Sequence, residues 1–412
     1  GFAYDIKGNG KWKAFGSYGW YYDITKLELP RGSFGGDHWV NYYWTLDTAD
    51  FSSIQCGEGP TGCPGRYIES VDFRHSSNQI DPGFEAYFNR PGMTGIDPNL
   101  KPVQMGEWTA GIEHELRPSI SVGARYVHKW LFRTIEDVGV LFQGSEIYLI
   151  SNPGEGLAVQ MEPSVPDLIT PKPVRDYDGI ELRINKRFAN NWSGSATYLY
   201  SRLFGNYSGL ASSDENGRVS PNVNRYYDNT VMSYDANGEA VYGRLQTDRP
   251  HVFKLTGVYD FKWGTIVGAN WFIESGIPQS TAFRFSGFPV FPFGRNDLGR
   301  TPVLSQLDLN LTQEFRLIGN KRVQLQANID NVFDQMTWTN YFLAITQGPS
   351  AYRDSLTVAN PPALSLYGAT GSYNLQQRIA GYTGTMRTNP FYTTPNVYQG
   401  RREIRVLARI TF

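Results

Sequence analysis

The sequence predicts an all-β fold, an antiparallel transmembrane β-barrel, with about eleven of its strands in this chain of 412 residues. Three observations support this prediction: strands with one apolar and one polar face recur, short turns alternate with long loops, and aromatic residues reach 15%. Side chains alternate across a strand, so an apolar face can meet lipid while a polar face meets water or a plug. Barrels of this kind also collect aromatic side chains at both membrane interfaces.

The clearest strand is the last one, over residues 402–412, which ends on an aromatic residue. One such strand is weak evidence, because any half-buried sheet strand alternates in the same way. Its apolar positions are Ile404, Val406, Ala408, Ile410 and Phe412, and its polar positions are Glu403, Arg405, Arg409 and Thr411.

Five pairs of strands before it repeat the alternation, and a very short turn joins the two strands of each pair. In the first pair the turn contains Asn9-Gly10, which strongly favours a hairpin. The pairs cover residues 2–22, 107–129, 180–200, 253–273 and 307–329, with turns at 7–10, 117–119, 189–191, 262–264 and 319–320. Together with the last strand they give about eleven strands.

Long segments rich in Gly, Pro, Asn, Ser and Tyr separate these pairs. Loops longer than about 15 residues are uncommon in compact soluble domains, whereas outer-membrane barrels have short periplasmic turns and long extracellular loops. The first segment is long enough to hold further strands at 39–46 and 67–73. The segments are 23–105, 131–173, 204–249, 276–300 and 335–400.

Composition excludes several alternatives. The net charge of −1 gives no general attraction to nucleic acid, and no run of about 18 uncharged apolar residues predicts a transmembrane helix. Soluble β-propellers need a repeat of about 40 to 50 residues, and sandwiches place turn signals every 8 to 12 residues. Neither pattern occurs here, so a soluble β-sandwich, propeller or β-helix is disfavoured.

The two cysteines, Cys56 and Cys63, stand in the segment CGEGPTGC. An even number of cysteines with a short Gly- and Pro-rich spacer favours a surface disulfide in an oxidising compartment, over a redox or metal role. The chain opens without a charged and apolar leader, so we expect a processed or an incomplete polypeptide and favour the second.

The sequence predicts no enzyme, cofactor or metal site. Glu113 and Glu115 share a strand face, but a polar lumen wall explains them better than a paired-acid site. Segments 47–53 and 233–240 offer oxygen ligands for Ca²⁺ without matching an EF-hand, and solvated turns explain them better. The five histidines, His38, His75, His114, His128 and His251, have no metal-binding spacing, and His114 and His128 suit a membrane interface.

Aromatic residues in the predicted loops are the candidate ligand-contacting surface, because rigid amphipathic rings dominate binding hot spots. The alternative is that these rings pack the loops against one another as a lid. The candidates are Trp39, Tyr42, Tyr43 and Trp44 in the first loop and Tyr226, Tyr227 and Tyr234 in the third.

Several segments resemble the C-terminal barrel of TonB-dependent outer-membrane receptors, specifically the Oar-like branch. Among them are WTAGIEHELRPSISVGARYVHKW, TDRPHVFKLTGVYDF, RVQLQANIDNVFDQ and the terminal RREIRVLARITF. NVFD is common to many such receptors, whereas GNYSGL and DRPH point more narrowly to the Oar-like branch. The resemblance covers most strands in family order, and the long loops carry little of it.

The resemblance implies a 22-stranded barrel in a Gram-negative outer membrane, a plug domain in its lumen and a TonB-binding segment. Residues 1–412 would then be the C-terminal part of the barrel domain, without the plug and N-terminal domains. Half a barrel leaves unpaired strand edges in hydrocarbon, where each unsatisfied group costs several kcal/mol. We therefore expect a longer polypeptide, or, as the alternative, closure with a second copy or a separate partner.

The implied function is TonB-dependent uptake or translocation of a large substrate, a peptide or protein, captured by extracellular loops. Implied partners are outer-membrane lipid and lipopolysaccharide, TonB through the missing N-terminal region, and a surface lipoprotein or neighbouring outer-membrane protein. The alternative is an adhesin or surface-structural barrel without active transport.

Overall fold

The computed structural model describes twelve ranges of the chain, and the statements below concern these ranges. They are residues 1–23, 40–45, 67–72, 95–142, 145–159, 170–209, 241–281, 283–285, 288–291, 293–316, 321–343 and 389–411.

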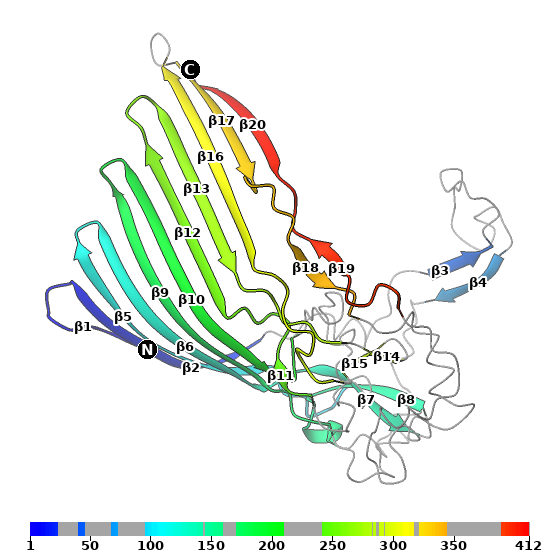
Figure 1. Cartoon of the computed structure of the whole chain (residues 1–412). Coiled ribbons are helices and arrows are strands. Elements are labelled where there is room, and N and C mark those ends of the chain that lie inside the picture. The colour runs from blue at the N-terminus through cyan, green and yellow to red at the C-terminus, as the bar shows by residue number, and fades with distance from the viewer. Residues whose placement is uncertain are drawn as a thin grey trace.

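One large antiparallel sheet dominates the structure, and its strand order follows the chain (Figure 1). Eleven strands lie side by side in this order, which confirms the predicted number, and β11 (Gly243–Arg244) pairs with the end of β10. The strands are β1 (Phe2–Asp5), β2 (Trp12–Tyr22), β5 (Gln104–Arg117), β6 (Ile120–Arg133), β9 (Arg175–Ala189), β10 (Trp192–Gly205), β12 (His251–Asp260), β13 (Thr265–Glu274), β16 (Leu304–Arg316), β17 (Arg322–Asp330) and β20 (Glu403–Thr411).

The register places side chains of one kind in rows across neighbouring strands. One row runs through Ile112, Ala124, Leu182, Tyr198 and Phe253, each directly opposite the next. Because successive side chains point to opposite faces, the residues one position further along form a row on the other face. That row contains Glu113, Gly123, Arg183, Thr197 and Lys254. We call the two sides the apolar face and the polar face.

Turn residues explain where these strands reverse. Asn190 and Asn191, between β9 and β10, both have positive φ values, 54° and 66°. Two consecutive positive φ values are those of a type I′ turn, which asparagine tolerates well and which matches the twist of the strands. Gly264, with φ of 92°, serves the turn between β12 and β13. The predicted turn at 319–320 lies outside the described residues.

Further strand pairs lie beyond the large sheet. β3 (Val40–Trp44) pairs with β4 (Tyr67–Asp72), close to the bounds expected within the first long segment. β14 (Phe283–Phe285) pairs with β15 (Phe288–Val290), and β18 (Trp338–Tyr341) pairs with β19 (Pro395–Tyr398). Figure 1 shows the short turns at one end of the large sheet and the pair β18–β19 toward the other.

The segment 131–173 differs most from the sequence-based expectation of a loop. It contains the end of β6, the hairpin β7 (Glu136–Phe142) and β8 (Ser145–Ser151), and a 3₁₀ turn at Gly156–Ala158. Val138 and Leu149 pair across this hairpin and are fully buried. The alternating β-branched and apolar residues of both strands favour pairing, although the Gly and Pro that follow them are typical of loops.

No helix in the described part of the chain is long and apolar enough to span a membrane. The first and last strands of the large sheet, β1 and β20, have a partner on one side each within the described ranges. Each therefore presents one free edge of backbone hydrogen-bonding groups.

Candidate functional site

Cross-strand ion pairs cover the polar face of β2, β5, β6 and β9, and we call this surface the charged wall. Glu113 is central to it: one carboxylate oxygen lies 2.7 Å from Lys13 Nζ and the other accepts a 2.5 Å hydrogen bond from Arg183. Lys13 lies directly opposite Glu113 on the next strand, whereas Arg183 reaches Glu113 across Gly123 of the intervening strand β6. Glu113 is therefore engaged by two cations, which fits the predicted wall rather than a catalytic acid.

Two further ion pairs extend the charged wall toward the other end of the strands. Arg125 donates to Glu181 at 2.9 Å, and Lys129 Nζ lies 2.7 Å from Glu107. The side chains of all seven residues in these pairs are 22% to 50% exposed, so positive and negative groups both remain available to a partner. The charged wall consists of Lys13, Glu107, Glu113, Arg125, Lys129, Glu181 and Arg183.

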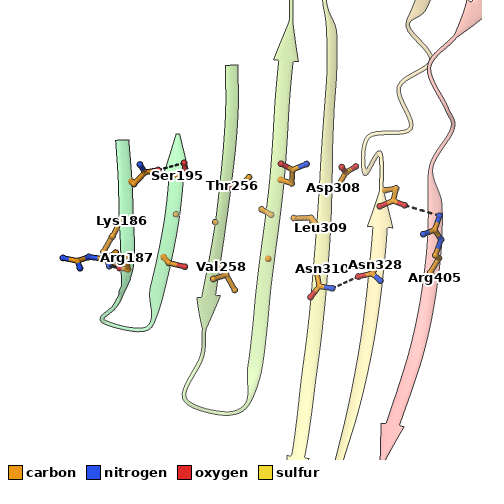
Figure 2. A pocket seen from close by; sticks show the side chains of 18 residues that line it. Lys186, Arg187, Ser195, Thr256, Val258, Asp308, Leu309, Asn310, Asn328 and Arg405 are labelled. Atoms are coloured by element: carbon orange, nitrogen blue, oxygen red, sulfur yellow. Dashed lines mark hydrogen bonds and ion pairs between the residues drawn. The ribbon is translucent and has the colours of Figure 1, made fainter. Parts of the chain in front are cut away.

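The polar face of β10 to β20 is lined mainly by amides and hydroxyls instead, as Figure 2 shows. Ser195 donates to Asn185 Oδ1 at 2.8 Å, and Asn310 donates to Asn328 on the next strand. A hollow of about 720 Å³ opens over these side chains. Its far side ends at Arg405, whose guanidinium lies 3.8 Å from Asp330.

A second hollow on the polar face has a volume of about 560 Å³ and lies further from the short turns. Arg125, Lys129 and Arg175 contribute cationic groups to its lining, and Leu199 and Leu203 contribute apolar surface. A site with apolar walls and a few charged groups is typical of ligand or peptide contact.

Beyond the strand ends, a buried carboxylate ties the segments around β12 together. Asp248, 1% exposed, pairs with Arg300 at 2.5 Å, and its Oδ1 accepts the backbone N–H of Leu203 at 2.6 Å. Arg300 also donates to the carbonyl oxygens of Asp248 and Gly276. Asp248 begins the DRPH motif, so that motif has a structural role in joining β10, β12 and the segment before β16.

The NVFD motif performs a similar role between β17 and β20. Asn331 Nδ2 donates to the carbonyl oxygens of Gln335 and Gly400, each at 2.8 Å. Arg401 donates to both carboxylate oxygens of Asp334, at 2.9 and 2.6 Å. These hydrogen bonds, with one from the Arg402 N–H, hold the pKa of Asp334 well below its usual range.

Aromatic rings gather toward both ends of the apolar face. Near the short turns, His114 stacks on Trp12 with ring centroids 3.8 Å apart. At the other end, His128 stacks on Trp130 and is hydrogen-bonded to the carboxylate of Asp178. The ring of His251 lies beside that of Tyr200. His114 and His128 therefore both lie among aromatic rings near strand ends, and their position at a membrane interface stays a prediction.

The length of the strands fits a membrane. Ten residue steps separate Ile120 from Trp130 on β6, which is about 33 Å along a strand. A strand tilt of about 40° reduces that length to about 25 Å, the usual height of the apolar band of an outer-membrane barrel.

Three candidate aromatic residues lie in the described part of the first loop. Trp44 contacts Tyr42 and Tyr67 at centroid distances of 5.8 and 6.2 Å, while Tyr43 on the opposite side of β3 is 45% exposed. The ring contacts suit the predicted packing role, and exposed Tyr43 suits ligand contact. Four candidate aromatic residues, both cysteines, two histidines and the two segments considered for Ca²⁺ lie outside the described residues. They are Trp39, Tyr226, Tyr227, Tyr234, Cys56, Cys63, His38, His75, 47–53 and 233–240.

Where side chains are described, no group of three or more His, Cys, Asp or Glu is placed to hold a metal ion. The arrangement offers binding surfaces rather than a nucleophile paired with a base. The sequence did not predict the ion pairs Asp248–Arg300 and Asp334–Arg401, although Asp248 belongs to the DRPH motif and Asp334 to the NVFD motif.

The chain matches a family model and is similar to a known transporter. The family model described as an outer membrane beta barrel domain matches residues 1–289, more than half of the chain. The TonB-dependent transporter Oar of Myxococcus xanthus is 25% identical over 98% of the chain. The chain spans about 37% of that relative's length.

Two solved structures are also similar. The outer membrane transporter YddB from Escherichia coli is 11% identical with a TM-score of 0.47, covering 84% of this chain and 37% of its own. The ferric-catecholate import receptor Fiu from E. coli K12 is 11% identical with a TM-score of 0.37, covering 85% of this chain and 32% of its own. The relative matched along nearly the whole chain is a TonB-dependent transporter.

Proposed function

Because this chain belongs to the outer membrane beta barrel domain family, we propose that it forms part of the wall of a TonB-dependent transporter. The observation that carries the proposal is the two-faced sheet of eleven strands, apolar toward lipid and lined by ion pairs and amides on the other side. Similarity to the transporter Oar along nearly the whole chain supports it.

The proposed barrel has 22 strands, and this chain supplies its C-terminal part. The free edges of β1 and β20 pair with further strands, since unpaired backbone groups in hydrocarbon cost several kcal/mol each. A plug domain fills the lumen and rests against the charged wall. TonB binds a segment of the N-terminal region and supplies the work for transport.

The proposed orientation in the Gram-negative outer membrane places the short turns in the periplasm and the long loops outside. The substrate is large, a peptide or protein, and the loop aromatics contact it. Exposed Tyr43 and the hollow around Arg175 are the described surfaces best suited to this role. A surface lipoprotein or a neighbouring outer-membrane protein is a further candidate partner.

Two measurements on the native full-length protein separate this proposal from an adhesin. The intact denatured mass is expected far above the 46.5 kDa of this chain, and the purified protein is expected to bind the periplasmic domain of TonB in calorimetry. A mass near that of this chain together with no TonB binding contradicts transport and favours the adhesin or surface-structural barrel.

A further inference from the structure

The apolar face carries a hollow of about 500 Å³ over β10, β12 and β13. Its floor is formed where small residues meet: Gly194 lies opposite Gly257, and Gly257 lies opposite Ala269. A larger side chain at any of these positions occupies the space. The hollow is thus a consequence of register, since the small residues come from three strands and align only in the folded sheet.

Its walls are apolar side chains that stand higher than the floor. Ile184 and Ile120 flank one side, and Leu255 and Val267 flank the other, with Tyr259 toward the short turns. The volume falls within the roughly 300 to 1,000 Å³ typical of sites for small ligands. Any occupant must therefore present mainly apolar surface.

A cation lies at the short-turn end. Lys186 is opposite Gly194, and its Nζ lies 4.1 Å from the centroid of the Trp192 ring. The ammonium also donates to the carbonyl oxygens of Ala189, Trp192 and Arg187, at 2.7, 3.0 and 3.3 Å, which fixes it beside the turn. Lysine and tryptophan together at a strand end are typical of the membrane interface, where headgroups lie.

We infer that this hollow binds one phospholipid, with an acyl chain over Gly194 and Gly257 and its phosphate beside Lys186. β10 and β12 are each paired on both sides, so their backbones offer no free edge to a protein strand. A hydrocarbon chain needs no hydrogen bond, and the positive charge of the ammonium attracts a phosphate. The site belongs to the inner leaflet, a choice that rests on the orientation proposed above.

The test uses the full-length protein, purified in detergent, stripped of lipid and titrated with dioleoyl phosphatidylglycerol under native mass spectrometry. Wild-type protein is expected to retain one lipid more tightly than any others. Ala269→Leu displaces about two methylene groups of the bound chain, which weakens that first association about tenfold. Ala124→Leu is the matched control, because Ala124 also lies on the apolar face but outside the hollow.

A second variant tests the headgroup. Lys186→Gln keeps an N–H donor for the turn carbonyls and removes the charge, so phosphatidylglycerol should bind about fivefold more weakly. Its preference over zwitterionic dioleoyl phosphatidylcholine should fall accordingly. Each variant is first checked for the heat-resistant folded form in gel electrophoresis.

Three results overturn the proposal: equal lipid retention in Ala269→Leu and wild type, equal losses in Ala269→Leu and Ala124→Leu, or a protein occupant that Ala269→Leu displaces. An unchanged lipid preference in Lys186→Gln overturns the assigned headgroup position. None of these measurements involves TonB or a substrate, so failure of the lipid site and failure of the transport proposal are separate outcomes.

Discussion

The Arg300 guanidinium lies 2.5 Å from the carboxylate of Asp248, although the two residues are 52 positions apart in the sequence. The side chain of Asp248 is 1% exposed. The same carboxylate accepts the N–H of Leu203, so one buried group joins three segments at the end of the sheet away from the short turns. Such a tie fixes where β10 and β12 end and where the segment before β16 approaches them.

Removing this carboxylate should destabilise the barrel strongly. Asp248→Ala removes the carboxylate that neutralises the Arg300 guanidinium and leaves the Leu203 N–H without its acceptor, at a cost of about 3 kcal/mol. This loss of stability is measured as the change in the free energy of unfolding, from urea titration in lipid vesicles. Asp260→Ala, at an exposed aspartate of β12, is the control and should change stability by no more than about 0.5 kcal/mol. Equal losses would contradict the structural role of Asp248.

The two faces of the sheet should respond differently to charge. Leu182→Arg places a cation near the middle of the apolar face and should cost about 2 to 4 kcal/mol in vesicles. Asn270→Arg places the same group on the polar face, opposite Asp308, and should be nearly neutral. If both variants lose the same stability, the assignment of the faces is wrong.

The ion pairs of the charged wall should contribute little individually. Because Glu113 and Arg183 are 28% and 41% exposed, a double-mutant cycle with Glu113→Gln and Arg183→Gln should give about 0.5 to 1 kcal/mol. That coupling should decrease as salt concentration rises. The distant pair Glu113 and Arg405 should show no coupling beyond error, and a salt-independent value for Glu113–Arg183 would argue against an aqueous lumen.

Gly106 on the apolar face has to be a glycine because the ring of Trp130 covers it. A Cβ at Gly106 would lie 2.3 Å from the ring of Trp130 on the neighbouring strand. Gly106→Ala should therefore cost about 1 to 3 kcal/mol, and the loss should shrink when Trp130→Ala is added. Gly257→Ala is the control, since its Cβ meets only the Ser193 carbonyl oxygen at 3.5 Å.

The contact between Asp334 and Arg401 should depend on pH. The folded pKa of Asp334 lies below that of the unfolded chain, about 3.9. Its contribution is therefore fully present above that value and is lost as the pH falls below it, when the carboxyl becomes protonated. Between pH 5 and pH 2, wild type should lose more stability than Asp334→Asn. Parallel curves would show that this aspartate contributes nothing.

Periodicity was sufficient to predict the large sheet, because a period of two assigns every residue of a long strand to one face. The turn at Asn190 and Asn191 was equally readable, since two asparagines tolerate the positive φ that a tight hairpin needs. The hairpin β7–β8 was missed because its strands, 136–142 and 145–151, are short and are followed by a Gly- and Pro-rich stretch at 152–156.

Long-range contacts were not readable from the sequence. Asp334 and Arg401 are 67 residues apart, and Gly106 and Trp130 meet only through the register of β5 and β6. The hollow at Gly194 and Gly257 depends on the alignment of two strands separated by more than forty residues of sequence. Whether the predicted loop aromatics bind a ligand, and whether Cys56 and Cys63 form a disulfide, stay predictions.

The strands of the large sheet lie in the same order as in the sequence, so each long connection can change without changing which strands pair. Every long connection, from the 23–103 segment onward, starts and ends at strands that are already hydrogen-bonded neighbours. Doubling a connection's length then adds only about 0.6 kcal/mol of closure entropy. Descendants of this chain can therefore exchange whole surface segments, and with them recognition, while the wall in the membrane keeps its register.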